Sequence, residues 1–201
     1  DEAALLTFDS ELQEVRAFTS EVGRVAAVNL AGTPWGLTSL YDALGDAARK
    51  AGERPNPHRA VLVITDGVDT GSRMSAADVS GMASAIQVPV YLAVVAAAVD
   101  NPAAKLATLT ADGKTTATAT LEDLARWTGG DMAIVTTPAE ISAAIEGIVS
   151  ELRHQYVLTF EPDERPGWHP LDVRTTRKRL LVHARGGYMA GPEALAVSTP
   201  K

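Results

Sequence analysis

The stretch RAVLVITDGVDTGS, residues 59 to 72, gives the clearest indication of the fold class of this chain. Residues 59–65 are mostly apolar and rich in β-branched side chains, which predicts a strand buried on both faces of a parallel sheet. Asp66 and Gly67 follow directly, so the chain turns at the carboxyl end of this strand. Because open α/β sheets bind their ligands beyond the carboxyl ends of their strands, Asp66 is a candidate site residue.

Strands and helices alternate on either side of this stretch. Apolar runs predict strands at residues 3–8, 88–95 and 131–135, and the alternating residues 13–20 predict a strand at a sheet edge. Helices are predicted at 21–30, 39–51, 75–86, 121–128 and 137–154, with apolar residues at helical spacing in 39–51. Ser75 is the expected N-cap of its helix, and Pro138 suits the first turn of the last one. The alternation predicts a doubly wound, mostly parallel, Rossmann-like α/β sheet over residues 1–154.

A different pattern follows the last predicted helix. Consecutive strands without intervening helices are expected at residues 154–162, 169–176 and 178–185. They predict a C-terminal antiparallel β extension over residues 155–190, with residues 191–201 as a tail. The Ala/Thr-rich residues 100–120 are expected to form a surface excursion. The chain is therefore expected to contain one α/β domain, an extension and a tail.

The composition narrows the functional classes. The formal net charge of −7 argues against nonspecific electrostatic binding to nucleic acid. The absence of cysteine excludes disulfides, thiol catalysis and cysteine-ligated metal sites. No apolar run is long enough to span a bilayer, and no catalytic Ser-His-Asp order, G-x-S-x-G elbow or phosphate-binding glycine loop stands out. A hydrolase or transferase is the weakest hypothesis, and we expect that the chain is not an enzyme.

Two oxygen-bearing side chains are expected at the same edge of the sheet. Thr38 precedes the helix predicted at 39–51, and Asp66 ends the strand predicted at 59–65. A hydroxyl and a carboxylate are hard ligands that suit Mg²⁺, with Ca²⁺ or Mn²⁺ as alternatives. The residues expected to surround these ligands or to rim the site are Ser39, Gly67, Asp69 and Trp35. The simpler interpretation remains open, in which Thr38 and Ser39 cap a helix and Asp66-Gly67 forms a turn.

The stretch GLTSLYDAL (36–44) followed by AVLVITDGVDTGS (60–72) resembles a von Willebrand factor type A domain, and the resemblance covers about residues 3–154. The later stretches YVLTFEP, GWHPLDV and VHARGGYMAG resemble the ending of bacterial, often exported, relatives of that family. In the family, a metal-ion-dependent adhesion site joins three loops. The resemblance matches Thr38 to the second loop and Asp66 to the third. The Asp-x-Ser-x-Ser of the first loop has no counterpart, and DVSGMAS (78–84) is expected to be helical instead.

The resemblance implies a metal-dependent module that binds an Asp or Glu carboxylate of a protein ligand. The alternative is a metal-free structural or assembly module of an exported bacterial protein. The family's first strand and first helix also have no counterpart here, and that strand is central in the fold. We predict that an N-terminal segment or a second chain supplies it between the strands at 3–8 and 59–65, because these two strands would otherwise leave unpaired backbone groups in the core.

Overall fold

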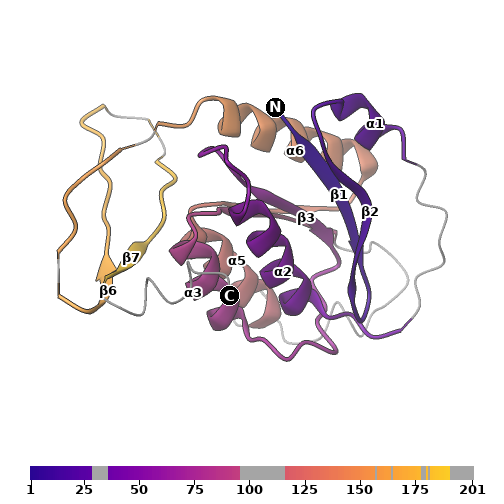
Figure 1. Cartoon of the computed structure of the whole chain (residues 1–201), viewed down its shortest axis with the longest axis horizontal. Helices are drawn as coiled ribbons and strands as arrows, with labels where there is room; N and C mark the ends of the chain where they lie inside the picture. The colour runs from indigo at the N-terminus through magenta and orange to yellow at the C-terminus, as the bar shows by residue number, and fades with distance from the viewer. Residues whose placement is uncertain are drawn as a thin grey trace.

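The computed structural model describes residues 1–28, 36–95, 116–156, 158–163, 165–177, 180 and 182–190. The elements in chain order are β1 (Ala3–Phe8), β2 (Leu12–Thr19), α1 (Val22–Ala26), α2 (Leu40–Gly52), β3 (Val61–Thr65), α3 (Ala76–Ala85), β4 (Val90–Val95), α5 (Thr116–Thr128), β5 (Met132–Val135), α6 (Pro138–Arg153), β6 (Gly167–Pro170) and β7 (Gly187–Ala190) (Figure 1).

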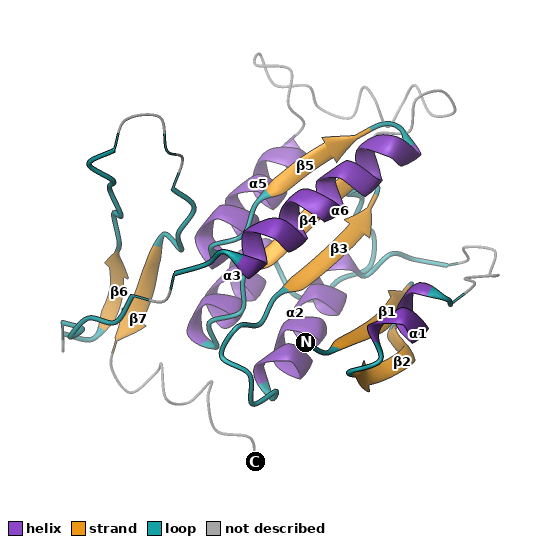
Figure 2. Cartoon of the chain, turned by 90° about the horizontal axis from the view of Figure 1, so that it is seen from above, coloured by secondary structure: helices purple, strands orange, loops and turns teal. Residues whose placement is uncertain are grey.

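A parallel sheet in the order β3-β4-β5 forms the centre of the molecule. Helices α2, α3 and α5 cover one face, where Val90 and Leu92 join their side chains in the buried core. Helix α6 covers β4 on the other face, and there the buried Tyr91 donates a hydrogen bond from its hydroxyl to Glu151 of α6 (Figure 2). The central strand β4 is apolar on both faces because helices cover both of them. Strand β3 was predicted to be buried on both faces, but two of its five residues are exposed, because α6 packs against β4 and β5. The predicted α/β class with a mostly parallel sheet is confirmed.

The N-terminal hairpin β1-β2 is a separate antiparallel sheet. Its side chains Leu6, Phe8 and Leu12 pack against the same core as the central sheet. Helix α2 contacts both the hairpin and β3, and an ion pair of 3.1 Å between Lys50 and Glu14 ties it to β2. Although β1 and β3 share this helix, they do not pair with each other. That the two strands do not pair agrees with the expectation of a missing strand between them, while its source stays a prediction.

Local capping signals explain two of the helices. The Ser75 hydroxyl accepts from the backbone N–H of Asp78 at 3.2 Å, and the Asp78 carboxylate accepts from the backbone N–H of Ser75 at 2.8 Å. This capping box begins α3, so residues 78–84 are helical as predicted. Thr137 caps α6 through the backbone N–H of Glu140, with Pro138 as the first helical residue.

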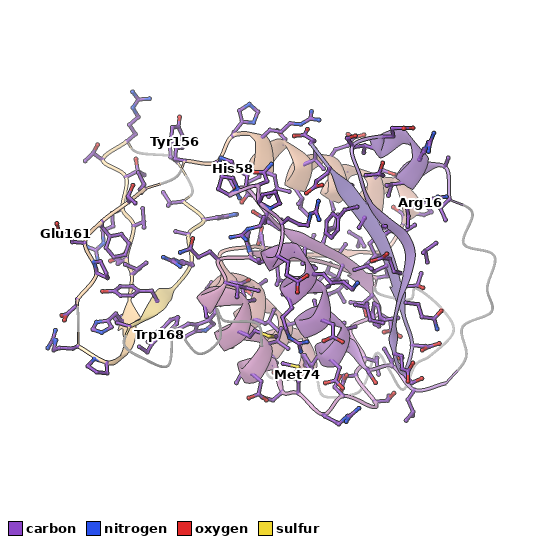
Figure 3. All side chains as sticks on the ribbon, in the orientation of Figure 1. Arg16, His58, Met74, Tyr156, Glu161 and Trp168 are labelled. Atoms are coloured by element: carbon purple, nitrogen blue, oxygen red, sulfur yellow. The ribbon has the colours of Figure 1, made fainter. Side chains whose placement is uncertain are left out.

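The C-terminal extension is antiparallel as predicted, but its strands lie elsewhere. Among the described residues, 154–162 and 178–185 form no strand, and β6 shares only two residues with the strand predicted at 169–176. Apolar side chains of the first of these segments stay exposed, since Tyr156 is 92% and Leu158 71% accessible. Strand β6 pairs with β7 instead, and the stacked rings of His169 and Tyr188 lie across this pair. The ring centroid of Trp168 on β6 (Figure 3) lies 5.0 Å from that of Trp127 on α5, which joins the extension to the helices.

Two helices also differ from their predicted bounds. Helix α1 ends at Ala26, although the helix was predicted to run to residue 30. Helix α5 begins at Thr116, inside the predicted excursion at 100–120, and the earlier part of that excursion lies outside the described residues. The predicted tail at 191–201 lies outside them as well.

A glycine pair tests the packing of β4 against the end of α5. A Cβ at Gly130 would lie 2.0 Å from the carbonyl oxygen of Val90, whereas a Cβ at Gly147 in α6 would meet nothing within 4 Å. Gly130→Ala should therefore lower the free energy of unfolding by about 1–3 kcal/mol, as overpacking does. Gly147→Ala, the matched control, should raise it by about 0.5–1 kcal/mol. Urea denaturation measures both, and equal values for the two variants would refute the described packing.

Candidate functional site

The two predicted site segments lie side by side at the carboxyl end of β3. The backbone N–H of Thr38 donates to the Thr70 hydroxyl at 2.8 Å. In return, the carbonyl oxygen of Thr38 accepts from the backbone N–H groups of Thr70 and Gly71, at 2.8 and 3.1 Å. These three bonds span about thirty residues of sequence and join the segment before α2 to the β3–α3 loop. The structure therefore brings together the two segments that the sequence singled out.

The start of α2 is capped by this loop and not by its own residues. Ser39 occupies the N-cap position, but its side chain makes no capping hydrogen bond. Instead, Oδ1 of Asp69 accepts from the backbone N–H of Leu40 at 2.8 Å, and the Ser72 hydroxyl accepts from those of Tyr41 and Asp42, at 2.9 and 3.2 Å. The interpretation of Thr38 and Ser39 as side-chain caps is wrong for this helix, because the free N–H groups of its first turn are satisfied from the loop.

Sequence reasoning missed Ser72 altogether. Its hydroxyl donates to Oδ1 of Asp69 at 2.5 Å, so the two capping side chains also hold each other. Asp69 was expected to support the site from beside Asp66, and it lies in the same loop, where it orients the segment before α2. No pattern around Ser72 signals a contact with a helix that begins more than thirty residues earlier.

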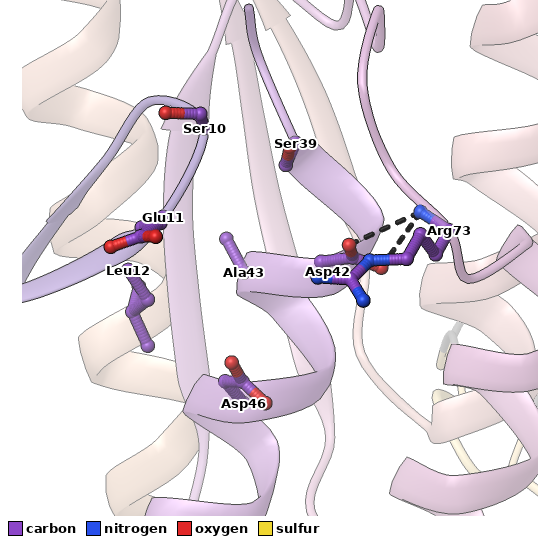
Figure 4. A pocket seen from close by; sticks show the side chains of 8 residues that line it. All are labelled: Ser10, Glu11, Leu12, Ser39, Asp42, Ala43, Asp46 and Arg73. Carbon is purple, nitrogen blue, oxygen red and sulfur yellow. Dashed lines mark hydrogen bonds between the residues drawn. The ribbon is translucent and has the colours of Figure 1, made fainter.

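Asp42 makes a second link between α2 and the loop. Its carboxylate accepts from the backbone N–H of Arg73 at 3.1 Å (Figure 4). It also accepts from the backbone N–H of Met74 at 2.8 Å. These two backbone hydrogen bonds hold the pKa of the Asp42 carboxyl below its usual range, and the bond from Met74 has the larger effect. Asp42 is thereby engaged in joining the helix to the loop.

A polar hollow of about 300 Å³ lies next to this link (Figure 4). It is lined by Ser10, Glu11, Leu12, Ser39, Asp42, Ala43, Asp46 and Arg73. The β1–β2 turn forms one wall, and it is fixed there because the backbone N–H of Ser39 donates to the carbonyl oxygen of Asp9 at 2.7 Å. Three segments, the hairpin turn, the start of α2 and the β3–α3 loop, thus meet at one place.

Asp66 lies at the start of the β3–α3 loop, directly after β3. It is exposed, and its Oδ1 accepts from the backbone N–H of Val68 at 3.0 Å, which makes a local turn. Gly67 has a φ of +79°, and a Cβ there would lie 3.2 Å from a methyl group of Val94, so glycine suits the position. Within the described part of the chain, neither Oδ2 of Asp66 nor the Thr38 hydroxyl forms a hydrogen bond.

These oxygens fit part of a magnesium shell only. Mg²⁺ requires about six oxygen ligands in octahedral geometry. Across the described ranges, no group of three or more His, Cys, Asp or Glu side chains could hold a metal ion. Both oxygens of Asp42 accept backbone hydrogen bonds, and Asp69 holds Leu40 and Ser72 together, whereas Asp66 makes only a local bond to Val68; we therefore keep Asp66 and Thr38 as candidate ligands. Trp35, expected at the rim, lies outside the described residues.

No family model and no curated protein matches this chain. Two solved structures are similar in fold. An aerotolerance-related membrane protein from Bacteroides fragilis, with multiple mutations to serines, is 17% identical with a TM-score of 0.54. The conserved hypothetical protein BatB from Bacteroides thetaiotaomicron is 15% identical with a TM-score of 0.52. Each alignment covers 77% of this chain and 80% of the other.

At these identities the similarity defines the fold alone: an α/β protein built on a parallel sheet, similar to these two bacterial proteins. None of the helices in the described ranges is long and apolar enough to cross a membrane.

The cap on α2 can be tested with two neighbouring carboxylates. Asp69→Ala removes the acceptor for Leu40 and a partner of Ser72, so it should cost about 1–3 kcal/mol of unfolding free energy. Asp66→Ala removes an exposed side chain with one local bond and should cost about 0.5 kcal/mol or less. Chemical denaturation without divalent metal compares them. A larger loss for Asp66→Ala would contradict the assignment of the cap to Asp69.

The lowered pKa of Asp42 predicts an acid-sensitive contribution to stability. A carboxyl with a depressed folded-state pKa contributes stability above its unfolded pKa of about 3.9, and this is lost as the pH falls through the folded value. Asp42→Asn should therefore be less stable than the parent protein at pH 7 and should lose less stability between about pH 5 and pH 2. Denaturation curves over this range measure the difference, and parallel pH profiles would exclude the contribution.

Proposed function

We propose that this chain is a protein-binding module that uses a divalent cation, Mg²⁺ in the first instance, at the junction of α2 and the β3–α3 loop. One observation carries the proposal. The Thr38 segment is hydrogen-bonded to the loop that contains Asp66, and each of these residues keeps an oxygen that no described residue engages. Both are hard oxygen donors of the kind that Mg²⁺, Ca²⁺ and Mn²⁺ select.

Neighbouring hydrogen bonds hold in place the two segments that carry Thr38 and Asp66. Asp69 and Ser72 hold the start of α2, and Asp42 holds the far end of the loop at Arg73 and Met74. Such supporting hydrogen bonds are what keeps ligands oriented toward a metal. Asp66 and Thr38 would hold the ion, and the remaining ligands would come from a segment beyond the described residues and from water.

The chemical class of the binding partner follows from the positive charge that a bound cation would give this site. The bound ion would supply a positive charge with an open position, and a carboxylate from an Asp or Glu of another protein is the ligand that fits it. The resemblance of this region to the von Willebrand factor type A family supports this assignment. Binding of this kind makes and breaks no covalent bond, so we propose no enzymatic activity.

An exported location is also part of the proposal. The resemblance of GWHPLDV and VHARGGYMAG to the ending of exported bacterial relatives supports it. One of the structurally similar proteins is itself described as a membrane protein, which is in keeping with the same location.

A metal-free assembly module is the second candidate. The observation in its favour is that the described residues include no group of three potential metal-ligating His, Cys, Asp or Glu side chains. In that case the bonds between the Thr38 segment and the β3–α3 loop serve the architecture alone, and partners dock without a cation.

Magnesium-dependent stabilisation separates the two candidates. In the intact protein, Mg²⁺ at about 100 times its Kd should stabilise the fold by about 2.7 kcal/mol relative to EDTA. Asp66→Ala should abolish this gain, because it removes the proposed carboxylate ligand. Asp123→Ala, which removes an exposed carboxylate of α5, is the matched control and should keep the gain. A gain that survives in Asp66→Ala, or no gain in the parent protein, favours the metal-free module.

A further inference from the structure

The segment that connects β6 to β7 is basic, although the chain as a whole is acidic. Residues 171–186, LDVRTTRKRLLVHARG, contain five of the chain's 18 Lys and Arg residues but only one of its 25 Asp and Glu residues. In Figure 2 this segment rises beyond the ends of β6 and β7, beside the helices, and we call it the finger. The finger therefore carries a charge opposite in sign to that of the remaining chain.

The base of the finger is held by the domain. The backbone N–H of Leu171 donates to the carbonyl oxygen of Gly186 at 2.9 Å, which joins the two ends of the finger. On the returning side, Nδ1 of His183 lies 3.4 Å from Oε1 of Glu151 on α6, and Arg185 is partly buried. The base thus has a defined place on the domain, and the exposed residues of the finger lie beyond it.

Apolar side chains of the finger are exposed. Val173, Leu180 and Val182 are 39%, 58% and 39% exposed. Because no described residue between β6 and β7 belongs to a strand, these side chains are not the outer face of a sheet, and the charges around them do not protect a strand edge. Exposed apolar side chains that occur together mark contact surfaces, whereas scattered ones need no explanation.

Basic side chains accompany these apolar ones. The Arg174 side chain is 85% exposed, and it forms an ion pair with Asp172, the one carboxylate of the finger. The Arg177 side chain is also exposed, and it forms no hydrogen bond or ion pair with any other described residue. Lys178 and Arg179 follow it directly in the sequence. The positive charge of the finger is therefore not neutralised within the finger.

An anionic lipid surface fits this combination better than a protein or a nucleic acid does. A standard protein interface takes about 20–30 residues from each side, and the finger has 16. Single-stranded nucleic acid is bound by stacking on aromatic rings, and residues 171–186 include no Phe, Tyr or Trp. At a bilayer, a few Lys and Arg side chains suffice for attraction to anionic headgroups, and apolar side chains between them enter the boundary with the acyl chains.

We propose that the finger binds the surface of an anionic phospholipid bilayer. Arg174 and Arg177 contact the lipid phosphates, and Leu180 and Val182 enter the headgroup region beside them. The contact is peripheral, because the finger lies on the bilayer and does not cross it. The inference rests on the charge and exposure of the finger, and it holds whether or not the Thr38–Asp66 site binds a metal.

Vesicle flotation in EDTA tests the proposal without any metal. The protein should partition onto vesicles of equal parts phosphatidylglycerol and phosphatidylcholine, and far less onto vesicles of phosphatidylcholine alone. Added NaCl should lower the partition coefficient, because salt screens the charge of the headgroups. Arg177→Ala should lower it about fivefold, the effect of one basic residue at an anionic surface. The matched control is Arg16→Ala, an equal change of charge on β2 at the side of the molecule opposite to Trp168, and it should have little effect (Figure 3).

The apolar contribution has a matched pair of its own. Leu180→Ser should lower the partition coefficient about five- to tenfold. Leu37→Ser removes a leucine with the same exposure of 58% from the segment before α2, and it should have little effect. Thermal melts establish that all variants are folded.

Three outcomes overturn the proposal. The first is equal partitioning of the parent protein onto anionic and neutral vesicles. The second is a loss in Arg16→Ala or Leu37→Ser as large as in the matching finger variant. The third is self-association in lipid-free solution that Arg177→Ala abolishes, which assigns the finger to the acidic surface of a second copy.

Discussion

The cap that the Asp69 carboxylate places on helix α2 is the interaction on which the rest of the site depends. A helix begins with backbone N–H groups that have no partner within the helix, and here Asp69 and Ser72 satisfy those of Leu40, Tyr41 and Asp42. The same bonds fix the β3–α3 loop to the segment before α2. As a result, Thr38 and Asp66 belong to one hydrogen-bonded surface, although they come from different parts of the chain.

Helix α2 connects the capped loop to the rest of the domain, because it packs against both the central sheet and the hairpin. Its buried side chains Leu40 and Leu44 face the core of the central sheet, and its exposed side carries the ion pair of Lys50 to the hairpin. The hairpin and the sheet are therefore organised around one helix, without a hydrogen bond between β1 and β3. This arrangement accounts both for a well-formed core and for strand edges that remain open.

Local patterns predicted local features well. The apolar run at 59–65 and the N-cap Ser75 signal their elements within a few residues, and the structure bears both out. The cap on α2 could not be predicted in this way, because Ser72 and Asp69 act on residues about thirty positions earlier. The prediction of a strand at 154–162 is wrong for the described residues, and for a related reason. Tyr156 and Leu158 alternate as strand residues do, but their burial depends on partner residues that the pattern does not specify.

Asp66 shows both what a sequence pattern can predict and what it cannot. Its position after a buried strand identified the edge at which a site should lie, and the structure shows an exposed carboxylate there beside the Thr38 segment. Whether this surface takes a cation depends on ligands that neither a pattern nor the described residues provide. The proposed function therefore unites two observations, the joined loops and the free oxygens, with the chemistry of hard cations.

Paramagnetic line broadening by Mn²⁺ reports directly on a cation bound at this surface. In NMR spectra of the intact protein, substoichiometric Mn²⁺ should broaden the backbone amides of Thr38, Asp66 and Val68, and excess Mg²⁺ should restore them. The amide of Asp163, which lies in the C-terminal extension, should stay sharp as the internal control. Broadening that is absent, uniform over the chain or centred on another group of carboxylates would contradict a cation site at the junction of α2 and the β3–α3 loop.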